Sequence, residues 1–167
     1  MGPLVDEAAV KMVNRYIRIA KKEGKPLLVR KADGDGYFVG PAIFTDVNPG
    51  SRIAQEEIFG PVVAIMRATD IDEALSIANG VSYALTGGIF SRSPKNIEKI
   101  KNNSESAIST SPGRLPALIV GRQPFGGFGM SGVGSKAGGP DYLLQFMNPK
   151  SICGNTLRKG FAPEQKI

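Results

Sequence analysis

Histidine and tryptophan are absent from this chain, and cysteine occurs once, as Cys153. Without histidine, imidazole-based catalysis and the usual zinc sites lose their main ligand, so we expect no bound metal. A single cysteine cannot form an internal disulfide. Because Cys153 falls in a short apolar strand expected near the end of the chain, we expect it to be a buried small residue and not a nucleophile.

Long apolar runs are also missing. No stretch approaches the roughly 20 apolar residues of a membrane-spanning helix, and the first residues do not resemble a cleavable signal. We therefore expect a cytoplasmic protein without a membrane partner. The chain has 167 residues, of which 41% are hydrophobic and 22% charged, values typical of one globular unit.

The net charge of +6 raises the alternative of a nucleic-acid-binding protein. Much of the excess falls on one predicted helix and the strand after it, at Lys11, Arg15, Arg18, Lys21, Lys22, Lys25, Arg30 and Lys31. Solvated helix faces show this distribution more often than DNA-binding surfaces do. We expect no nucleic-acid partner.

Hydrophobic periodicity and turn residues predict alternating helices and strands. The expected helices lie at about 4–23, 51–57, 71–78, 93–102 and 141–146, with Ser51, Asp70 or Asp72, and Ser93 as caps. The expected strands lie at 27–30, 37–44, 61–66, 85–90 and 151–153, and Asp-Gly pairs at 33–36 predict a hairpin turn. This alternation is typical of an α/β fold with a parallel sheet and flanking helices.

Two motifs have competing interpretations. Gly127, Gly129 and Gly132 match the spacing G-x-G-x-x-G of a dinucleotide-binding loop. The motif should follow a strand and open a helix, but Pro124 precedes it and further glycines follow, so we expect a close-packed loop. Glu56 and Glu57 could be a solvated surface pair, or one could be functional while the other is solvated.

A resemblance to a known family supports a functional role for this region. The string N-P-G-S-R-I-A-Q-E-E-I-F-G-P-V-V, with D-E-A-L-S-I-A-N and L-T-G-G-I-F-S after it, resembles the catalytic domain of aldehyde dehydrogenases. The string R-Q-P-F-G-G-F-G-M-S-G-V-G-S-K-A-G-G-P-D-Y-L-L-Q-F is similar to the ending of glutamate-semialdehyde (1-pyrroline-5-carboxylate) dehydrogenases. Residues 1–147 would then be the carboxy-terminal part of the catalytic domain, and 148–167 an oligomerisation strand and tail.

The resemblance also implies site residues. Glu57 would accept hydrogen bonds from the nicotinamide ribose of NAD, and Phe59 would pack beside it. Phe125 would line the wall around the aliphatic stem of a small aldehyde substrate, glutamate semialdehyde in proline catabolism. The terminal strand would pair with a partner subunit in a homo-oligomer.

Family catalysis proceeds by thiolate attack, hydride transfer to NAD and hydrolysis of a thioester. The resemblance implies that the nucleophilic cysteine, the glutamate base and the NAD domain precede this chain's first residue, so no catalytic residue is assigned and the chain alone should be inactive. A non-enzymatic module that docks on a full-length dehydrogenase, and one half of a split enzyme, are the alternatives.

One segment departs from the family pattern. Where the family reads Thr-Gly-Ala, which holds the substrate carboxylate, this chain has Pro116 and Ala117. Proline has no amide hydrogen to donate, which puts this anchor in doubt. Because both flanks match, we hypothesise a compensated frameshift in the gene, and the alternative reading frame should then restore the family sequence.

Overall fold

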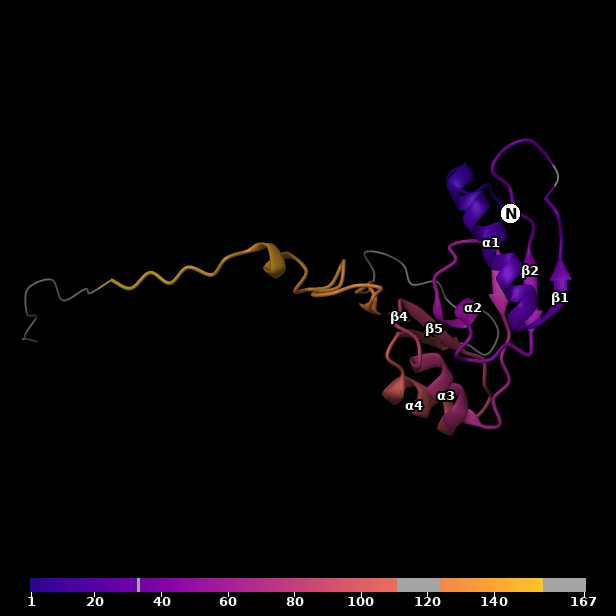
Figure 1. The fold of residues 1–167 in the computed structure, drawn as a ribbon. Helices are drawn as coiled ribbons and strands as arrows, with labels where there is room; N and C mark the ends of the chain where they lie inside the picture. Colours follow the sequence, from indigo (N-terminus) through magenta and orange to yellow (C-terminus); the bar gives the residue numbers. More distant parts are fainter. Residues whose placement is uncertain (33, 111–123, 155–167) are drawn as a thin grey trace, which may run out of the picture.

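The computed structural model describes residues 1–32, 34–110 and 124–154 (Figure 1). The elements follow in the order α1 (Glu7–Glu23), β1 (Lys25–Val29), β2 (Ala42–Thr45), α2 (Arg52–Gln55), β3 (Val62–Ala64), α3 (Ile71–Asn79), β4 (Tyr83–Ala84), β5 (Thr86–Ile89), α4 (Pro94–Asn103), β6 (Ala107–Thr110), β7 (Phe128–Gly129) and the 3-10 helix η1 (Leu143–Phe146). The predicted α/β class is confirmed. Within the described ranges, no helix is long and apolar enough to cross a membrane.

The sheets are mixed and small. Strands β1, β2 and β3 form one sheet, in which β1–β2 is antiparallel and β2–β3 is parallel. Strand β5 pairs with β6 in parallel, and β4 pairs with β7 antiparallel. The predicted parallel sheet is therefore correct for two of the four pairings seen in the described residues.

Strands β1 and β2 pair antiparallel as the predicted hairpin requires, but the second strand is shorter than expected and the predicted tight turn at 33–36 is wrong, because residues 30–41 connect the two strands. Gly34 and Gly36 in this connection have φ angles of 108° and 118°, which suit glycine. Tyr37 does not join the ladder, because its carbonyl accepts a hydrogen bond from the Leu4 amide at 2.7 Å. Pairing therefore begins only at Ala42.

Helix α1 packs on this first sheet. It begins at Glu7 and not at residue 4, because the Asp6 side chain accepts from the Ala9 amide at 2.7 Å and caps the helix. Its apolar stripe is buried at Val13, Ile17 and Ala20. All the basic residues predicted to form a solvated face are exposed, as expected.

The hydrophobic core lies between α1, the first sheet and α2. Its buried members are Val13, Ile17, Ala20, Ala42, Phe44, Val47, Ile53 and Ile58. Helices α3 and α4 contribute no buried residue, although each has an amphipathic face. The second half of the described chain is therefore held mostly by caps, polar contacts and short strand pairings.

Those polar contacts follow from the predicted caps. Asp70 accepts from the amides of Asp72 and Glu73, both at 2.9 Å, and so caps α3. Ser93 accepts from the Asn96 amide at 3.4 Å at the start of α4. The two helices are then joined to each other through an ion pair between Lys99 and Asp72.

The last described residues depart from the sequence prediction. Beyond η1, residues 147–154 run away from the body as an extended arm (Figure 1). The expected strand at 151–153 is absent, because a strand requires a hydrogen-bonding neighbour and nothing in the described part of the chain lies beside the arm. The expectation that Cys153 is buried is wrong for the same reason: its side chain is exposed.

Candidate functional site

The segment from Glu56 to Gly60 connects α2 to β3 and alternates between anchored and exposed residues. Glu56 is half-buried and hydrogen-bonded, Ile58 is buried in the core, and Gly60 lies against α1. The residues between them, Glu57 and Phe59, are exposed. The two predicted cofactor-binding residues are therefore brought together on one short segment whose other positions are fixed.

Glu56 is held by side chains from two helices. Arg52, one turn earlier on α2, donates from Nε and Nη2 to the two carboxylate oxygens of Glu56, each at 2.8 Å. The Tyr16 hydroxyl, on α1, donates to Glu56 Oε2. The Arg52 guanidinium also lies 5.7 Å from the centre of the Tyr16 ring, a cation–π distance. The prediction that one acid of the pair is merely solvated while the other is functional is wrong for Glu56, because its carboxylate accepts these hydrogen bonds.

These contacts fix the charge states within the cluster. The hydrogen bonds from Arg52 and then Tyr16 lower the pKa of the Glu56 carboxyl to about 2, so it is ionised at neutral pH. The same hydrogen bond raises the pKa of Tyr16, with burial adding to the effect. The pKa of Arg52 is raised by its pairing with Glu56. The cluster is a charge-assisted network in which each group stabilises the observed protonation state of the others.

A second hydrogen-bonded contact joins α2 to α1. The Ile53 amide donates to Glu23 Oε2 at 3.1 Å, so a carboxylate from the end of α1 satisfies a free amide at the start of α2. The predicted cap, Ser51, makes no side-chain hydrogen bond to the helix. The cap on this four-residue helix thus comes from a residue thirty positions away, which local sequence patterns do not reveal.

Phe59 has an unusual backbone conformation. Its φ angle is 54°, in the left-handed region that side-chain-bearing residues rarely adopt, and its side chain is 81% exposed. The other non-glycine residue with positive φ in the described part is Asp46, a short polar residue of the kind that tolerates it. A strained and exposed aromatic residue is typical of a functional site and not of packing.

Beside Phe59 lies an apolar cavity of about 370 Å³. Its walls are formed by the first residues of the chain and the start of α1, namely Pro3, Leu4, Val5, Ala9 and Met12, together with Phe59. The ring of Phe59 therefore borders a hollow that could receive a flat or aliphatic group.

Phe125 belongs to a separate loop. Its amide donates to the Ala137 carbonyl at 2.9 Å, which closes the glycine-rich segment into a compact loop with Phe125 half-buried. Among the described residues, no hydrogen bond, ion pair or shared cavity joins Phe125 to Glu57 or Phe59. The structure therefore brings together two of the three predicted site residues.

The glycine-rich loop is docked on β4. The Met130 amide donates to the Ser82 carbonyl at 2.9 Å, and Ser131 Oγ accepts from the Ala84 amide at 3.1 Å. Gly129 has a φ of 56° and passes so close to Ser82 that a side chain would collide with its carbonyl. No helix follows Gly132 directly in the described residues, so the prediction of a close-packed loop in place of a dinucleotide motif is confirmed.

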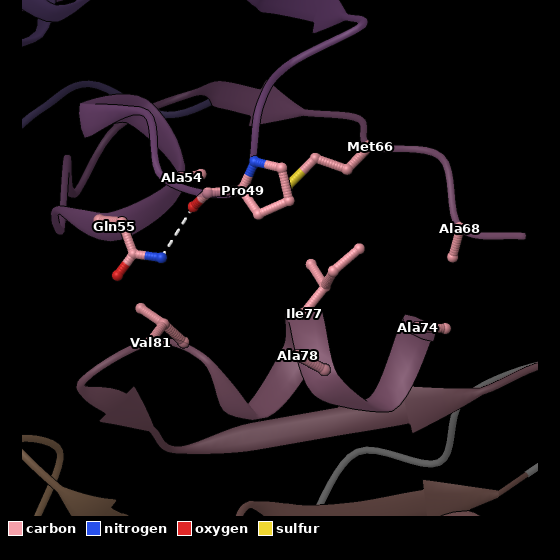
Figure 2. Close-up of a pocket in the computed structure, with 9 residues that line it drawn as sticks. All are labelled: Pro49, Ala54, Gln55, Met66, Ala68, Ala74, Ile77, Ala78 and Val81. Atoms are coloured by element: carbon pink, nitrogen blue, oxygen red, sulfur yellow. Dashed lines mark hydrogen bonds between the residues drawn. The ribbon is translucent and has the colours of Figure 1, made fainter. Parts of the chain in front are cut away.

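A further hollow of about 310 Å³ lies between α2 and α3 (Figure 2). Its lining is apolar apart from Gln55, whose amide donates to the Pro49 and Gly80 carbonyls at 2.8 and 3.0 Å. Ile77, Ala74 and Ala78 of α3 face this gap (Figure 2). It contains no titratable group, and we interpret it as incomplete packing of α3. The predicted carboxylate-anchor positions Pro116 and Ala117 lie outside the described residues.

Comparison with known proteins places these features in a family. Residues 1–152 match the Aldehyde dehydrogenase family. The chain is 48% identical over 155 residues to a 1-pyrroline-5-carboxylate dehydrogenase of Geobacillus sp. (strain WCH70), covering 91% of this chain and 30% of the relative. It is 46% identical to 1-pyrroline-5-carboxylate dehydrogenase 2 of Bacillus subtilis (strain 168), with the same coverage. The chain thus spans about 30% of the length of these curated relatives.

Solved structures agree. A 1-pyrroline-5-carboxylate dehydrogenase from Thermus with bound NAD superposes with a TM-score of 0.81 at 42% identity, covering 87% of this chain and 28% of that one. A proline utilization A protein of Bdellovibrio bacteriovorus gives a TM-score of 0.87 at 49% identity, covering 99% of this chain and 17% of that one. Since sequence and fold agree over nearly all the described residues, the chain belongs to the aldehyde dehydrogenase family.

Proposed function

We propose that this chain forms one wall of the active site of an NAD-dependent dehydrogenase that oxidises L-glutamate γ-semialdehyde, the open form of 1-pyrroline-5-carboxylate, to glutamate in proline catabolism. The observation that carries the proposal is the exposed pair Glu57 and Phe59 on an otherwise anchored segment. Relatives at 46–48% identity named 1-pyrroline-5-carboxylate dehydrogenase support the substrate.

The chemistry of the exposed pair fits the cofactor. The Glu57 carboxylate is exposed, and no other described residue binds it, so both of its oxygens can accept hydrogen bonds from the two hydroxyls of a ribose. The exposed Phe59 ring, beside its apolar cavity, can pack against the ribose and the nicotinamide. When bound, NAD would accept a hydride from the substrate carbon.

Phe125 would serve the substrate. Its loop is held to β4 by main-chain hydrogen bonds, so the half-buried ring has a fixed place from which to contact an aliphatic stem. Its apolar surface would exclude water from the stem and so favour an aldehyde with a short methylene chain.

The isolated chain should not catalyse this reaction. Thiolate chemistry requires a cysteine whose pKa is lowered by its surroundings and whose position is fixed. Cys153 is the only thiol of the chain, and it is exposed on the extended arm. The nucleophile must therefore come from other polypeptide sequence.

The arm supports a further part of the proposal, that residues 148–167 pair with a partner subunit in a homo-oligomer. Met147 and Ile152 are 63% and 82% exposed, and apolar side chains on an extended segment favour burial against another chain. The same surface supports the alternative of a non-enzymatic module that docks on a full-length dehydrogenase. A cytoplasmic site of action is part of the proposal.

A hybrid enzyme tests the proposal. The chain would replace the corresponding part of the Geobacillus relative, and NADH formation from NAD and semialdehyde would be followed by absorbance. We expect activity in the hybrid and none in the isolated chain. In the hybrid, Glu57→Gln should raise the KM for NAD roughly tenfold or more, since hydrogen bonds to a charged group are lost. Glu7→Gln, at an exposed carboxylate on α1, is the matched control.

Three outcomes would contradict the proposal: turnover by the isolated chain, a folded hybrid without activity, or equal KM values for the two variants. Native mass spectrometry of the isolated chain with the intact Geobacillus enzyme distinguishes the docking module, because only that alternative predicts a specific complex with an enzyme that is already complete.

A further inference from the structure

Exposure alternates along the segment that carries the proposed cofactor contacts. Position 58 is only 9% exposed, while position 59 is 81% exposed. A segment of five residues can present two side chains reproducibly only if the residues between them are fixed, because each free backbone residue otherwise retains many conformations. The fixing of Glu56, Ile58 and Gly60 is therefore as important to the site as the presented residues.

Of these three anchors, Ile58 and Gly60 act through packing, which is not directional. Glu56 differs, because its carboxylate receives hydrogen bonds from Arg52 on α2 and Tyr16 on α1. Two donors on one carboxylate define the position and the rotation of the group, and a bidentate guanidinium adds planarity to this restraint. Glu56 immediately precedes Glu57. Holding the Glu56 carboxylate in place restrains the backbone of Glu56, and this sets the orientation of Glu57.

Tyr16 is the residue that connects this carboxylate to the body of the protein. It is forty positions away in sequence, on the helix that also supplies Val13 and Ile17 to the core. Arg52 alone could hold Glu56 only relative to the short helix α2. The tyrosine joins the carboxylate to α1, which contributes Val13, Ile17 and Ala20 to the core.

We propose that Tyr16 and Arg52 are positioning residues, which fix the Glu56 carboxylate to α1 and thereby orient Glu57 and Phe59 toward the ribose and nicotinamide of NAD. The proposal rests on the function proposed above for Glu57 and Phe59. In this proposal neither Tyr16 nor Arg52 needs to touch the cofactor. Their contribution is the low conformational freedom of the contact segment before the cofactor arrives, which reduces the entropy lost on binding.

Hydrogen exchange on the 167-residue chain, without cofactor, tests the anchoring directly. Tyr16→Phe removes one hydroxyl and keeps the ring under Arg52. We expect the amides of Glu56 and Val62, which donate to the Arg52 and Gly60 carbonyls at 2.8 Å at either end of the segment, to exchange roughly threefold to tenfold faster. This is the range that the loss of one hydrogen bond supports, and the amides of β2 should keep their rates. Tyr37→Phe, at an exposed tyrosine of the hairpin connection, is the matched control and should change neither group.

Arg52→Gln is the second variant and should have the same local effect, because it removes the bidentate donor. Unchanged exchange at the amides of Glu56 and Val62 in both variants would overturn the proposal. Equal acceleration across all elements would also overturn it, because a group that merely stabilises the fold produces that pattern.

The hybrid enzyme separates this proposal from the function on which it rests. There Tyr16→Phe should raise the Kd and KM for NAD several-fold and leave kcat within about twofold, since weaker ground-state binding alone affects KM. If Glu57→Gln has no effect on NAD binding while Tyr16→Phe still loosens residues 57–60, the proposed function fails and the anchoring stands. If Glu57→Gln weakens NAD binding and Tyr16→Phe changes neither exchange nor Kd, the positioning role fails.

Discussion

Gly60 lies directly against Val13. A Cβ atom at position 60 would come within 2.5 Å of Val13 Cγ2 and 3.0 Å of Cγ1. Val13 is fully buried on α1, and Gly60 is the last residue of the anchored segment before β3. The close approach of segment and helix therefore depends on the absence of a side chain at position 60.

Gly60→Ala should destabilise the chain, because the added methyl group must displace either the buried valine or the backbone. Overpacking of this kind costs about 1–3 kcal/mol. Urea unfolding followed by circular dichroism would measure it as a lower midpoint with an unchanged slope.

Val13→Ala makes the prediction specific. The single substitution should be destabilising through the cavity it leaves, but in the double variant the two methyl groups of Val13 are gone and the alanine at 60 has room. The double variant should thus lose less free energy of unfolding than the two single variants lose together, by about 0.5–3 kcal/mol. If the losses of the two single variants simply add, the contact between positions 13 and 60 is not the cause of the destabilisation by Gly60→Ala.

Phe59→Gly should separate stability from function. The left-handed conformation at φ 54° costs a side-chain-bearing residue about 1–2 kcal/mol, and glycine adopts it without this cost. Glycine also makes the unfolded chain more flexible, and the larger loss of conformational entropy on folding cancels about 0.5–1 kcal/mol of this gain. We expect the free energy of unfolding, measured by urea unfolding, to be equal or higher by up to about 1.5 kcal/mol, while the hybrid enzyme binds NAD more weakly.

Phe59→Ala is the control for the lost ring, because alanine keeps the strain. It should weaken NAD binding as much as glycine does but show no gain in stability. A glycine variant less stable than the alanine variant would contradict the strain at this position.

The predictability of these features from sequence depended on the range of the interactions. Asp70 and Ser93 cap their helices as predicted, because a cap is decided by residues three or four positions apart. Glu57 and Phe59 were recognised through a family resemblance and not from their chemistry. Arg52 and Glu56 have the i, i+4 spacing of an ion pair, which was a usable signal. Tyr16 gave none, because its contact spans forty positions.

The failures have a similar physical origin. The strand expected at 151–153 would bury Cys153, but burial requires a second surface that the described residues do not provide. Helices α3 and α4 each have an amphipathic face, yet neither helix contributes a buried residue. Periodicity identifies a face that tends to be buried, whereas the partner that buries it is a property of the assembled fold.

Acidification should weaken the Glu56 cluster in a defined range. A carboxyl group whose pKa is about 2 in the folded chain, below its ordinary value of 4.5, contributes stability above pH 4.5 and loses it as the pH falls toward 2. Asp46 and Glu73 also have lowered pKa values, through Lys25 and Thr69 respectively, and contribute in the same direction. The informative quantity is therefore the stability difference between the wild type and Glu56→Gln, which should shrink between pH 4.5 and 2 in urea titrations. A constant difference would contradict the role of the charge.

Alkaline pH should weaken the same cluster by removing the phenolic proton of Tyr16. The pKa of Tyr16 is raised above its ordinary 10.0, so the folded chain holds the phenolic proton more tightly than the unfolded chain does. This contribution is complete below pH 10 and is lost as the pH rises through the raised value. Tyr16→Phe, which has no such proton, should show no corresponding loss.

Thiol labelling tests the arm that carries Cys153. The chain has one cysteine and its side chain is exposed, so Ellman's reagent should react with the folded chain at low concentration about as fast as with the chain in urea. If residues 148–167 pair with a second copy, the backbone beside Cys153 becomes covered and the reaction should slow as protein concentration rises. Met147→Ser and Ile152→Ser, which remove exposed apolar side chains of the arm, should abolish this concentration dependence. Slow labelling at every concentration would show that Cys153 is buried within a single chain, and fast labelling at every concentration would contradict pairing through the arm.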